Sequence, residues 1–256
     1  MPSRRKKKIS RWIISFMVVA VIGLGGWFFY QWLRYRNAKF TRYPEFGISL
    51  PNEYTIHGID VSRYQSIIAW EEVKLMKVDN VQLGFAFIKA TEGIESLDPQ
   101  FKRNWKRSKN NNITRGAYHF FNAGKDGRMQ AENFIKRVEL ESGDLPPVLD
   151  VEQRNGVSKA QLQKEVKKWL EVVEAYYHVT PVIYTNADFY AQNLGSGFDK
   201  YPFWVAHYYQ QEQPRIDRNW IFWQHNDRGN VNGITSRVDF NVFSGDSIEF
   251  KSLLLP

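Results

Sequence analysis

The stretch PPVLDVE at residues 146–152 decides the fold class, because it combines a short apolar strand with two acidic residues at its end. Apolar residues on both sides of the backbone are typical of a strand buried in a parallel sheet. Side chains alternate along a strand, so Asp150 and Glu152 point to the same face, about 6.6 Å apart along the backbone. Two neighbouring, partly buried carboxyl groups raise the pKa of at least one of them, which provides an acid beside a base. From these residues alone, a metal site, a salt-bridge pair and a pair of surface acids remain open.

Seven similar runs lie before and after this stretch, separated by segments with helical periodicity. Together with residues 147–152, they predict strands at 56–61, 83–90, 115–121, 181–185, 203–207, 220–224 and 237–241. Helical patterns lie between the first five strands and become scarce after about residue 195. This order predicts an α/β protein with a modified TIM-like barrel, (β/α)5(β)3, and a doubly wound sheet is the structural alternative.

Three of the predicted helices have clear sequence signals. The best defined begins at Ser158, where Gln161 completes a capping-box pattern and an apolar face follows. Asp98 followed by Pro99 predicts the N-cap and first position of an earlier helix. A third helix is marked by the apolar residues Met129, Phe134 and Val138.

Polar side chains occur on these strands, where a barrel would place its functional residues at the C-terminal ends. They are Asp60 in the first strand, Tyr118 and His119 in the third, Asp150 and Glu152 in the fourth, Tyr184 in the fifth and Asp239 in the eighth. His119 and His207 are predicted to be structural, because neither belongs to HExxH or another metal-binding spacing. Lys89 and Glu92 in KATEG are expected to hold the second loop together. We therefore predict neither a metal ion nor a cofactor.

The charge of the chain is concentrated at its N-terminus. The formal net charge is +8, but the first forty residues hold nine of the 35 basic residues and none of the 27 acidic ones. The remaining chain is close to neutral, which argues against a nucleic-acid-binding face. The sequence contains no cysteine, which excludes disulfides and thiolate chemistry.

The N-terminus reads as a membrane anchor. Residues 12–33 contain no charge and, as a helix of about 33 Å, are long enough to span a bilayer. Residues 1–11 form a basic segment, so the positive-inside rule predicts a cytoplasmic N-terminus, with the following chain outside the bacterial cytoplasmic membrane. Residues 34–53 are expected to be a linker and residues 54–256 the barrel domain. A cleaved signal peptide is the competing interpretation.

Eight phrases of the sequence, taken in order, resemble the glycoside hydrolase family 25 lysozymes. They are HGIDVSRYQ (57–65), FAFIKATEG (85–93), RGAYHFF (115–121), PPVLDVE (146–152), PVIYTN (181–186), FWVAHY (203–208), IFWQHN (221–226) and RVDFNVF (237–243). The resemblance covers roughly residues 54–250. It implies a modified (β/α) barrel that cleaves the β-1,4 bond between N-acetylmuramic acid and N-acetylglucosamine in peptidoglycan.

By position, the resemblance implies that Glu152 is the general acid/base and that Asp150 stabilises the reacting centre. Asp60 and Asp239 would complete the acidic cluster. The 2-acetamido group of the substrate favours a retaining, substrate-assisted reaction in which Asp150 supports the acetamido nitrogen. A covalent Asp150 nucleophile and an inverting reaction require different carboxyl separations and remain open.

Aromatic residues provide further candidates for substrate contacts. Tyr118 and Tyr184 are placed at strand ends, and Tyr118 either donates to the acetamido group or has a structural role. Trp204, Trp223 and Tyr208 are candidate sugar-stacking residues, although aromatic residues on strands more often belong to the core.

Two other functions remain as alternatives. A chitinase-like enzyme would cleave a related polymer, but Val148 stands where a longer aspartate series would be expected. A non-catalytic peptidoglycan-binding module is disfavoured, because all four acids are present. The expected partners are peptidoglycan glycan strands and, through residues 12–33, the lipid bilayer. The catalytic domain is expected to be monomeric.

Overall fold

The structure is a computed structural model that describes residues 4–36 and 39–256, with the side chains of residues 4–11 and 34–36 outside the description. It contains two compact units, Met1–Lys39 and Phe40–Pro256. Of the predicted basic segment 1–11, residues 1–3 and all side chains therefore lie outside the described residues.

The first unit is built from helix α1 (Arg4–Arg36). Within it, Trp12–Leu33 forms a 22-residue stretch with a mean hydropathy of 2.1, and none of this stretch is buried inside the structure. Length and composition make this the one candidate membrane span among the described residues. The same properties fit a signal sequence.

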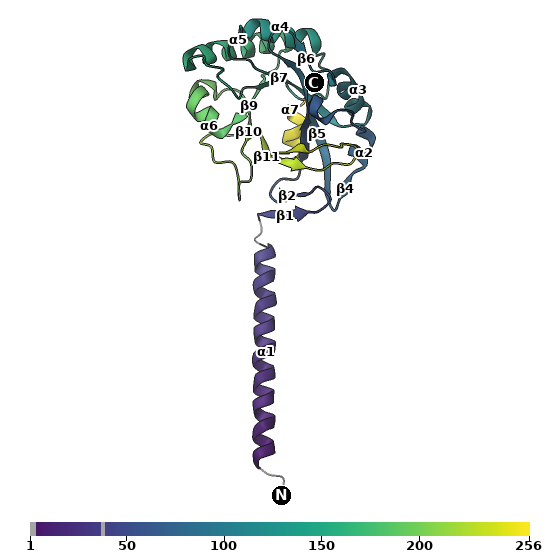
Figure 1. Ribbon diagram of the computed structural model, residues 1–256, viewed down its shortest axis with the longest axis vertical. Coiled ribbons are helices and arrows are strands. Elements are labelled where there is room, and N and C mark those ends of the chain that lie inside the picture. The colour runs from purple at the N-terminus through teal and green to yellow at the C-terminus, as the bar shows by residue number, and fades with distance from the viewer. Residues whose placement is uncertain (1–3, 37–38) are drawn as a thin grey trace. The chain divides into compact units, whose positions relative to one another are not determined.

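The second unit is a closed barrel of eight strands (Figure 1). In chain order these are β3 (His57–Val61), β5 (Val81–Glu92), β7 (Thr114–Phe120), β8 (Val148–Asp150), β9 (Val182–Asn186), β10 (Phe203–Ala206), β11 (Phe222–Gly229) and β12 (Val238–Phe243). Neighbouring strands are parallel except at β12, which runs antiparallel to both β11 and β3. All eight predicted strands are confirmed.

Helices follow the first five barrel strands, as the (β/α)5(β)3 prediction requires. They are α2 (Trp70–Leu75), α3 (Phe101–Asn110), α4 (Gly127–Arg137), α5 (Lys159–Tyr177) and the short α6 (Ala187–Phe189). Turns η1 (Arg63–Gln65), η2 (Tyr190–Leu194) and η3 (Ser196–Phe198), with short strands β4 (Lys77–Val78) and β6 (Ser96–Leu97), complete the connections. No helix separates β10 from β11 or β11 from β12 in the described chain.

Two of the predicted helix starts differ in detail from the structure. Ser158 caps α5 and accepts from the Gln161 backbone N–H at 3.2 Å. The Gln161 side chain donates to Glu165 instead of closing a full capping box. Helix α3 begins at Phe101, later than predicted, although Asp98 Oδ1 still accepts the Gln100 N–H at 2.9 Å, as an N-cap side chain does. The other Asp98 oxygen accepts the Arg63 N–H at 2.8 Å and so joins two loops.

The barrel unit starts earlier than predicted. Strands β1 (Phe40–Tyr43) and β2 (Ile48–Pro51) pair as an antiparallel hairpin within residues 34–53, the predicted linker. The apolar side chains of Phe46, Ile48 and Leu50 are buried in the main core. Because this hairpin buries apolar surface, it is part of the domain rather than a flexible connection.

Alternation along the strands divides the core into two layers. On β5, Phe85 and Phe87 point into the barrel, whereas Ala86 and Ile88 pack toward the surrounding helices. Gly58 on β3 makes room for the Phe85 ring, because a Cβ atom there would lie 2.4 Å from it. The barrel interior is therefore filled with aromatic rings at this level.

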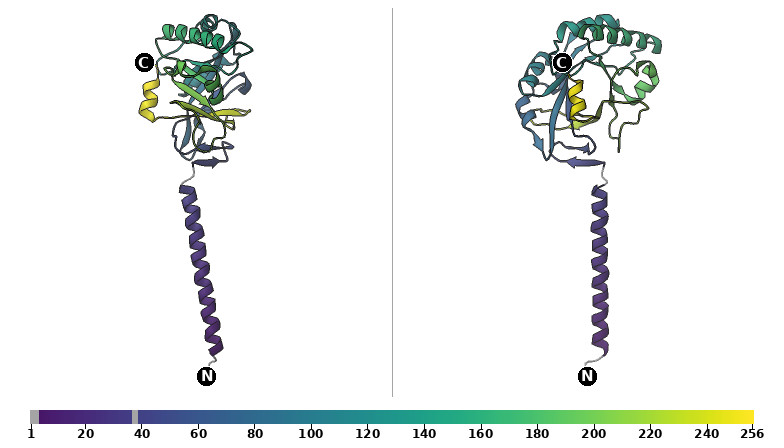
Figure 2. Two further views of the ribbon diagram at one scale, coloured as in Figure 1. Left: turned by 90° about the vertical axis from the view of Figure 1, so that its left-hand side faces the viewer. Right: turned by 180° about the vertical axis from the view of Figure 1, so that it is seen from behind.

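Helix α7 (Ser247–Leu253) closes one end of the barrel. Figure 1 shows it across the ring of strands, and the side view in Figure 2 shows it at one end. Its Phe250 ring contacts Phe85 and Phe243 with centroid distances of 5.7 and 5.2 Å. The opposite end, formed by the C-terminal ends of the parallel strands, contains the polar residues.

Candidate active site

A cavity of about 230 Å³ opens at the C-terminal ends of the parallel strands. Its lining residues all come from strands of the barrel or the loops after them. They are Asp60, Ser62, Tyr64, Lys89, Tyr118, Phe120, Asp150, Glu152, Tyr184, Trp204, Tyr208, Gln224 and Asp239. The structure thus brings together the four predicted acids and four of the five predicted aromatic residues.

Asp150 ends β8 and Glu152 follows it by two residues, so both face the cavity. Asp150 is buried, and its Oδ1 atom has no hydrogen-bond partner among the described residues. Burial and the nearby Glu152 raise the pKa of Asp150 well above its usual value. Burial also raises the pKa of Glu152, while the Tyr184 hydroxyl and Lys89 oppose this rise. Both carboxyl groups therefore hold protons more tightly than solvated acids do.

Asp60 and Asp239 form a second carboxyl pair, because they are directly opposite each other on β3 and β12. Burial raises the pKa of Asp60 to about 6, against the opposing effect of hydrogen bonds from Asn241 and Gln224. Burial and the Asp60 charge raise the pKa of Asp239 to about 9. At neutral pH the pair accordingly holds one proton between its two carboxyl groups.

The position of Asp239 differs from the simple barrel rule. It was expected among strand C-terminal ends, but it lies near the start of β12. Because β12 runs opposite to its neighbours, its first residues reach the same end of the barrel as the last residues of β3. Reversed strand direction thus delivers Asp239 to the cavity.

A hydrogen-bond network links the second pair to the aromatic wall. Gln224 donates to Asp60 Oδ2 at 2.7 Å and accepts from the hydroxyls of Tyr184 and Tyr208 at 2.7 and 2.6 Å. Asn241 also donates to Asp60 Oδ2, at 2.8 Å. The Asp60 carboxylate is therefore held in one orientation from two strands.

Gln224 and Asn241 were not predicted from the sequence. A signal was present, since Gln224 directly follows the apolar run WIFW (220–223) and Asn241 stands two residues after Asp239 on the same face. Ser62, Tyr64 and Phe120 also line the cavity without having been predicted.

The predicted aromatic residues divide into two groups. Trp204 lines the cavity, stacks on Phe87 with a centroid distance of 4.4 Å and donates to Asn241 at 2.8 Å. Tyr118, Tyr184 and Tyr208 also line it.

Trp223, in contrast, lies outside the cavity, and its prediction as a substrate contact is corrected. It is fully buried on the outer side of β11, where its indole N–H donates to the His207 carbonyl at 2.9 Å. Its neighbour Gln224 occupies the inward position instead. Alternation along the strand allows only one of these two adjacent residues to face the cavity.

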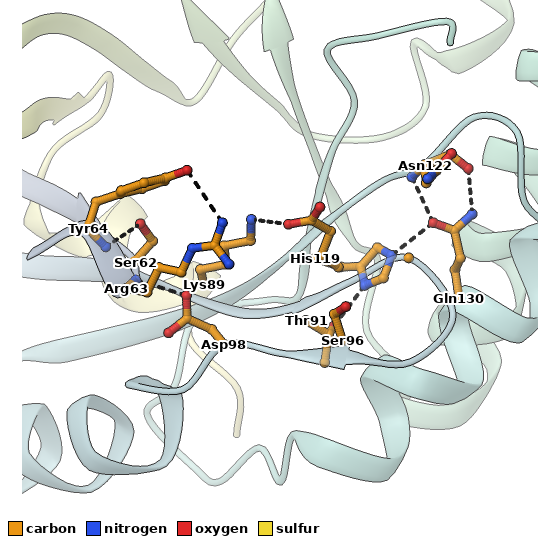
Figure 3. Close-up of polar contacts among 12 residues, drawn as sticks. Ser62, Arg63, Tyr64, Lys89, Thr91, Ser96, Asp98, His119, Asn122 and Gln130 are labelled. Atoms are coloured by element: carbon orange, nitrogen blue, oxygen red, sulfur yellow. Dashed lines mark hydrogen bonds and ion pairs between the residues drawn. The ribbon is translucent and has the colours of Figure 1, made fainter. Parts of the chain in front are cut away.

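The predicted structural residues have partners outside the reacting centre. His119 contacts Thr91 and Gln130 on the outer side of β7 (Figure 3). Lys89 pairs with Glu92 at 2.6 Å. His207 accepts from the Arg215 backbone N–H at 3.1 Å. Among the residues that the structure describes, no group of three or more His, Cys, Asp or Glu residues is arranged to hold a metal ion.

The arrangement provides a proton donor, a second carboxyl group with a free oxygen and an oriented polar wall. A carboxyl group with a raised pKa can protonate a leaving oxygen, while a neighbouring carboxylate stabilises positive charge that develops in the substrate. The half-buried rings of Tyr118 and Tyr208 suit a ring-shaped substrate. Trp204 is almost fully buried against Phe87 and Tyr184 and supports the wall from behind.

Comparison with known proteins agrees with this chemistry. The profile of the family described as Glycosyl hydrolases family 25 matches residues 59–234. The chain is 48% identical to Escherichia coli YegX over 209 residues, which cover 82% of this chain and 77% of YegX. It is 35% identical to lysozyme M1 of Streptomyces globisporus over 218 residues, covering 77% and 71% of the two chains. A solved family 25 glycosyl hydrolase from Bacillus anthracis superposes with a TM-score of 0.73 at 32% identity, covering 80% of this chain and 96% of that one. The chain belongs to glycosyl hydrolase family 25 and is a glycoside hydrolase.

Proposed function

We propose that the protein is an N-acetylmuramidase, a lysozyme that cleaves the β-1,4 bond between N-acetylmuramic acid and N-acetylglucosamine in peptidoglycan. The observation that carries this proposal is the complete set of four acids at the open end of a family 25 barrel. Its relative from Streptomyces globisporus is a lysozyme by name. The acids argue against a binding module that has lost catalysis.

In the proposed reaction, Glu152 protonates the leaving glycosidic oxygen. Asp150 is the buried partner, and its unpaired Oδ1 atom offers an acceptor for the N–H of the substrate acetamido group. A hydrogen bond to that oxygen favours the ionised form of Asp150, and the negative charge of Asp150 then favours the protonated form of Glu152. Substrate binding thereby prepares the acid for the first step.

The acetamido carbonyl oxygen then attacks the anomeric carbon as the glycosidic bond breaks, forming an oxazolinium ion. Water, deprotonated by Glu152, opens this ion, so the product retains the configuration of the substrate. Identifying the anomer first released tests this path. A covalent Asp150 intermediate would also give retention and would be trapped by mass spectrometry, whereas an inverted product would refute both.

The decisive test of the function is Glu152→Gln in purified residues 40–256. We expect the wild-type segment to release reducing muramic acid ends from peptidoglycan and the variant to lose this activity by at least about a hundredfold, because amide nitrogen cannot donate the catalytic proton. Glu71→Gln, at an exposed position on α2, is the matched control. Undiminished release by the Glu152 variant, or faster cleavage of chitin than of peptidoglycan by the wild type, would contradict the proposal.

We further propose that Trp12–Leu33 anchors the protein in the bacterial cytoplasmic membrane, with the N-terminus inside and the barrel outside. The supporting facts are the length and hydropathy of this stretch and the basic residues before it. In the sequence, residues 34–39 connect this stretch to the barrel unit. The anchor therefore favours remodelling of wall close to the cell's own membrane.

Cell fractionation and protease accessibility test this topology. An intact N-terminus in the membrane fraction, with the barrel digested from outside, is the expected result. A shortened mature protein in the soluble fraction would identify a cleaved signal peptide instead.

A further inference from the structure

Acidic side chains outnumber basic ones in the lining of the cavity. Its lining contains the four carboxyl groups described above and a single cationic side chain, that of Lys89. An ammonium group near several carboxyl groups in a partly desolvated cavity has a stronger effect on them than it would have in water.

Alternation on β5 places Lys89 at this point. Phe85, Phe87 and Lys89 occupy successive inward positions, so Lys89 stands above the aromatic floor of the barrel. The pairing of β5 with β7 is irregular directly after Lys89, between Lys89 and Thr91. Beyond this irregularity, Thr91 turns outward to meet His119, as Figure 3 shows.

The ammonium group of Lys89 is held in place from two sides. Its Nζ atom lies 2.6 Å from Glu92 Oε2 and 4.6 Å from the centre of the Phe120 ring. The Lys89 side chain is 12% exposed, whereas that of Glu92 is 44% exposed. Glu92 is thus the more exposed partner of this ion pair, and it does not line the cavity that Lys89 shares with the reacting carboxyl groups.

Other charged and titratable groups also face this ammonium. They line the same cavity and come from several elements: Asp150 and Glu152 from β8 and the residues after it, Asp60 from β3, Asp239 from β12, Tyr64 from η1 and Tyr118 from β7. Asp60 and Asp239 share a proton with each other, and Asp60 is already held by two amides. Arg63, the other nearby cation, is exposed and therefore strongly screened by solvent.

We propose that Lys89 is a positioning residue whose ammonium group, fixed between Glu92 and Phe120, determines the pH range in which the Asp150 and Glu152 pair holds a single proton. Lys89 favours the loss of one proton from the pair, and Glu92 opposes it. The consequence for catalysis rests on the proposed function, but the effect on the pair itself does not.

The directions of the pKa shifts agree with this role. Lys89 lowers the pKa of both Asp150 and Glu152, whereas Glu92 raises that of Asp150. Removing the two charges one at a time should therefore move the titration of the pair in opposite directions. If the ion pair were purely structural, removing either Lys89 or Glu92 would break it and would move the titration of the carboxyl pair in the same direction.

The test uses the full chain in detergent micelles, with ¹³C-labelled carboxyl groups followed by NMR during a pH titration. In Lys89→Met, which keeps the length of the apolar stem, we expect both carboxyl groups to titrate roughly one pH unit higher. In Glu92→Gln we expect Asp150 to titrate lower. Lys89→Arg, which keeps the charge, should stay within about 0.3 units of the wild type.

The pH profile of peptidoglycan cleavage should move in the same directions as the two titrations. Shifts of equal sign in Lys89→Met and Glu92→Gln, or no shift in either, would overturn the inference. If Lys89→Met does not fold, Glu92→Gln alone still decides, since an unchanged or raised Asp150 titration refutes the role. Absence of activity in the wild type would refute the proposed function, while the NMR titration would still test Lys89.

Discussion

Replacing Asp239 with asparagine should stabilise the protein at neutral and alkaline pH. Burial and the Asp60 charge raise the pKa of Asp239 to about 9, so the folded protein keeps a proton there at pH 7. Asparagine has nearly the same shape, and its amide can still donate to Asp60. Because the amide has no proton to lose, the variant avoids the free-energy cost of keeping residue 239 protonated in the folded state. The hydrogen bond to Asp60 is kept.

The sign and size of this effect follow from proton linkage. An unfolded aspartate has a pKa near 3.8, whereas the pKa of folded Asp239 is about 9. Between these values the folded state holds one proton more than the unfolded state, so the stability contribution present at low pH is lost as pH rises. At about 1.4 kcal/mol per pH unit, the linkage gives an upper value of about 4 kcal/mol at pH 7. Because Asp60 shares the titration and water enters the cavity, we expect a gain of about 2 kcal/mol for Asp239→Asn.

Urea unfolding of residues 40–256, followed by tryptophan fluorescence at pH 5, 7 and 9, measures this gain. The difference in free energy of unfolding between the variant and the wild type should grow from pH 5 to pH 9. Asp79→Asn is the matched control, because Asp79 is exposed and asparagine also tolerates its positive φ of 51°. Equal pH slopes for wild type and Asp239→Asn would refute the raised pKa of Asp239.

Three further substitutions test the walls of the cavity and the core behind them. Gln224→Leu should lower the free energy of unfolding by about 2 to 4 kcal/mol, because it leaves the buried Asp60 carboxylate with one fewer hydrogen-bond donor. It should also lower the turnover by more than about tenfold. Urea unfolding measures the first effect and reducing-end release the second. Trp204→Phe should raise KM for peptidoglycan by roughly tenfold, whereas Trp223→Phe should leave KM unchanged and lower stability by about 1 to 3 kcal/mol. Steady-state kinetics measures both KM values. Equal changes of KM in the two variants would contradict the placement of Trp204 at the cavity and Trp223 outside it.

The strands were predictable because their physical signal is local. Each is a short apolar run between breakers, and the glycines in HGID and RGAY mark points where an aromatic ring crosses the barrel interior. The N-terminal hairpin was missed for the opposite reason. Phe46, Ile48 and Leu50 are a few apolar residues among polar ones, and only their burial against the distant barrel makes them core.

The two tryptophans show where local reasoning stops. Trp204 and Trp223 are both tryptophans within short apolar strands. Trp204 nevertheless lines the cavity, whereas Trp223 is packed outside it. The difference depends on which residues of each strand face the barrel interior. That choice is fixed by the pairing with neighbouring strands, which the sequence does not identify. The inward position of Gln224 could have been inferred from Asp239 and Asn241 only once the pairing of β11 with β12 was known.

The reversed direction of β12 explains why the acidic cluster can form at all. In a fully parallel barrel, Asp239 would lie near the end occupied by Phe243 and α7, because it stands at the start of its strand. Running antiparallel, β12 sets Asp239 opposite Asp60 and carries Asn241 one inward position deeper, within reach of the same carboxylate. Loss of the last helices is therefore linked to the chemistry, since a strand that follows β11 without a crossover helix can pair with it antiparallel. The second carboxyl pair is a consequence of topology as much as of residue type.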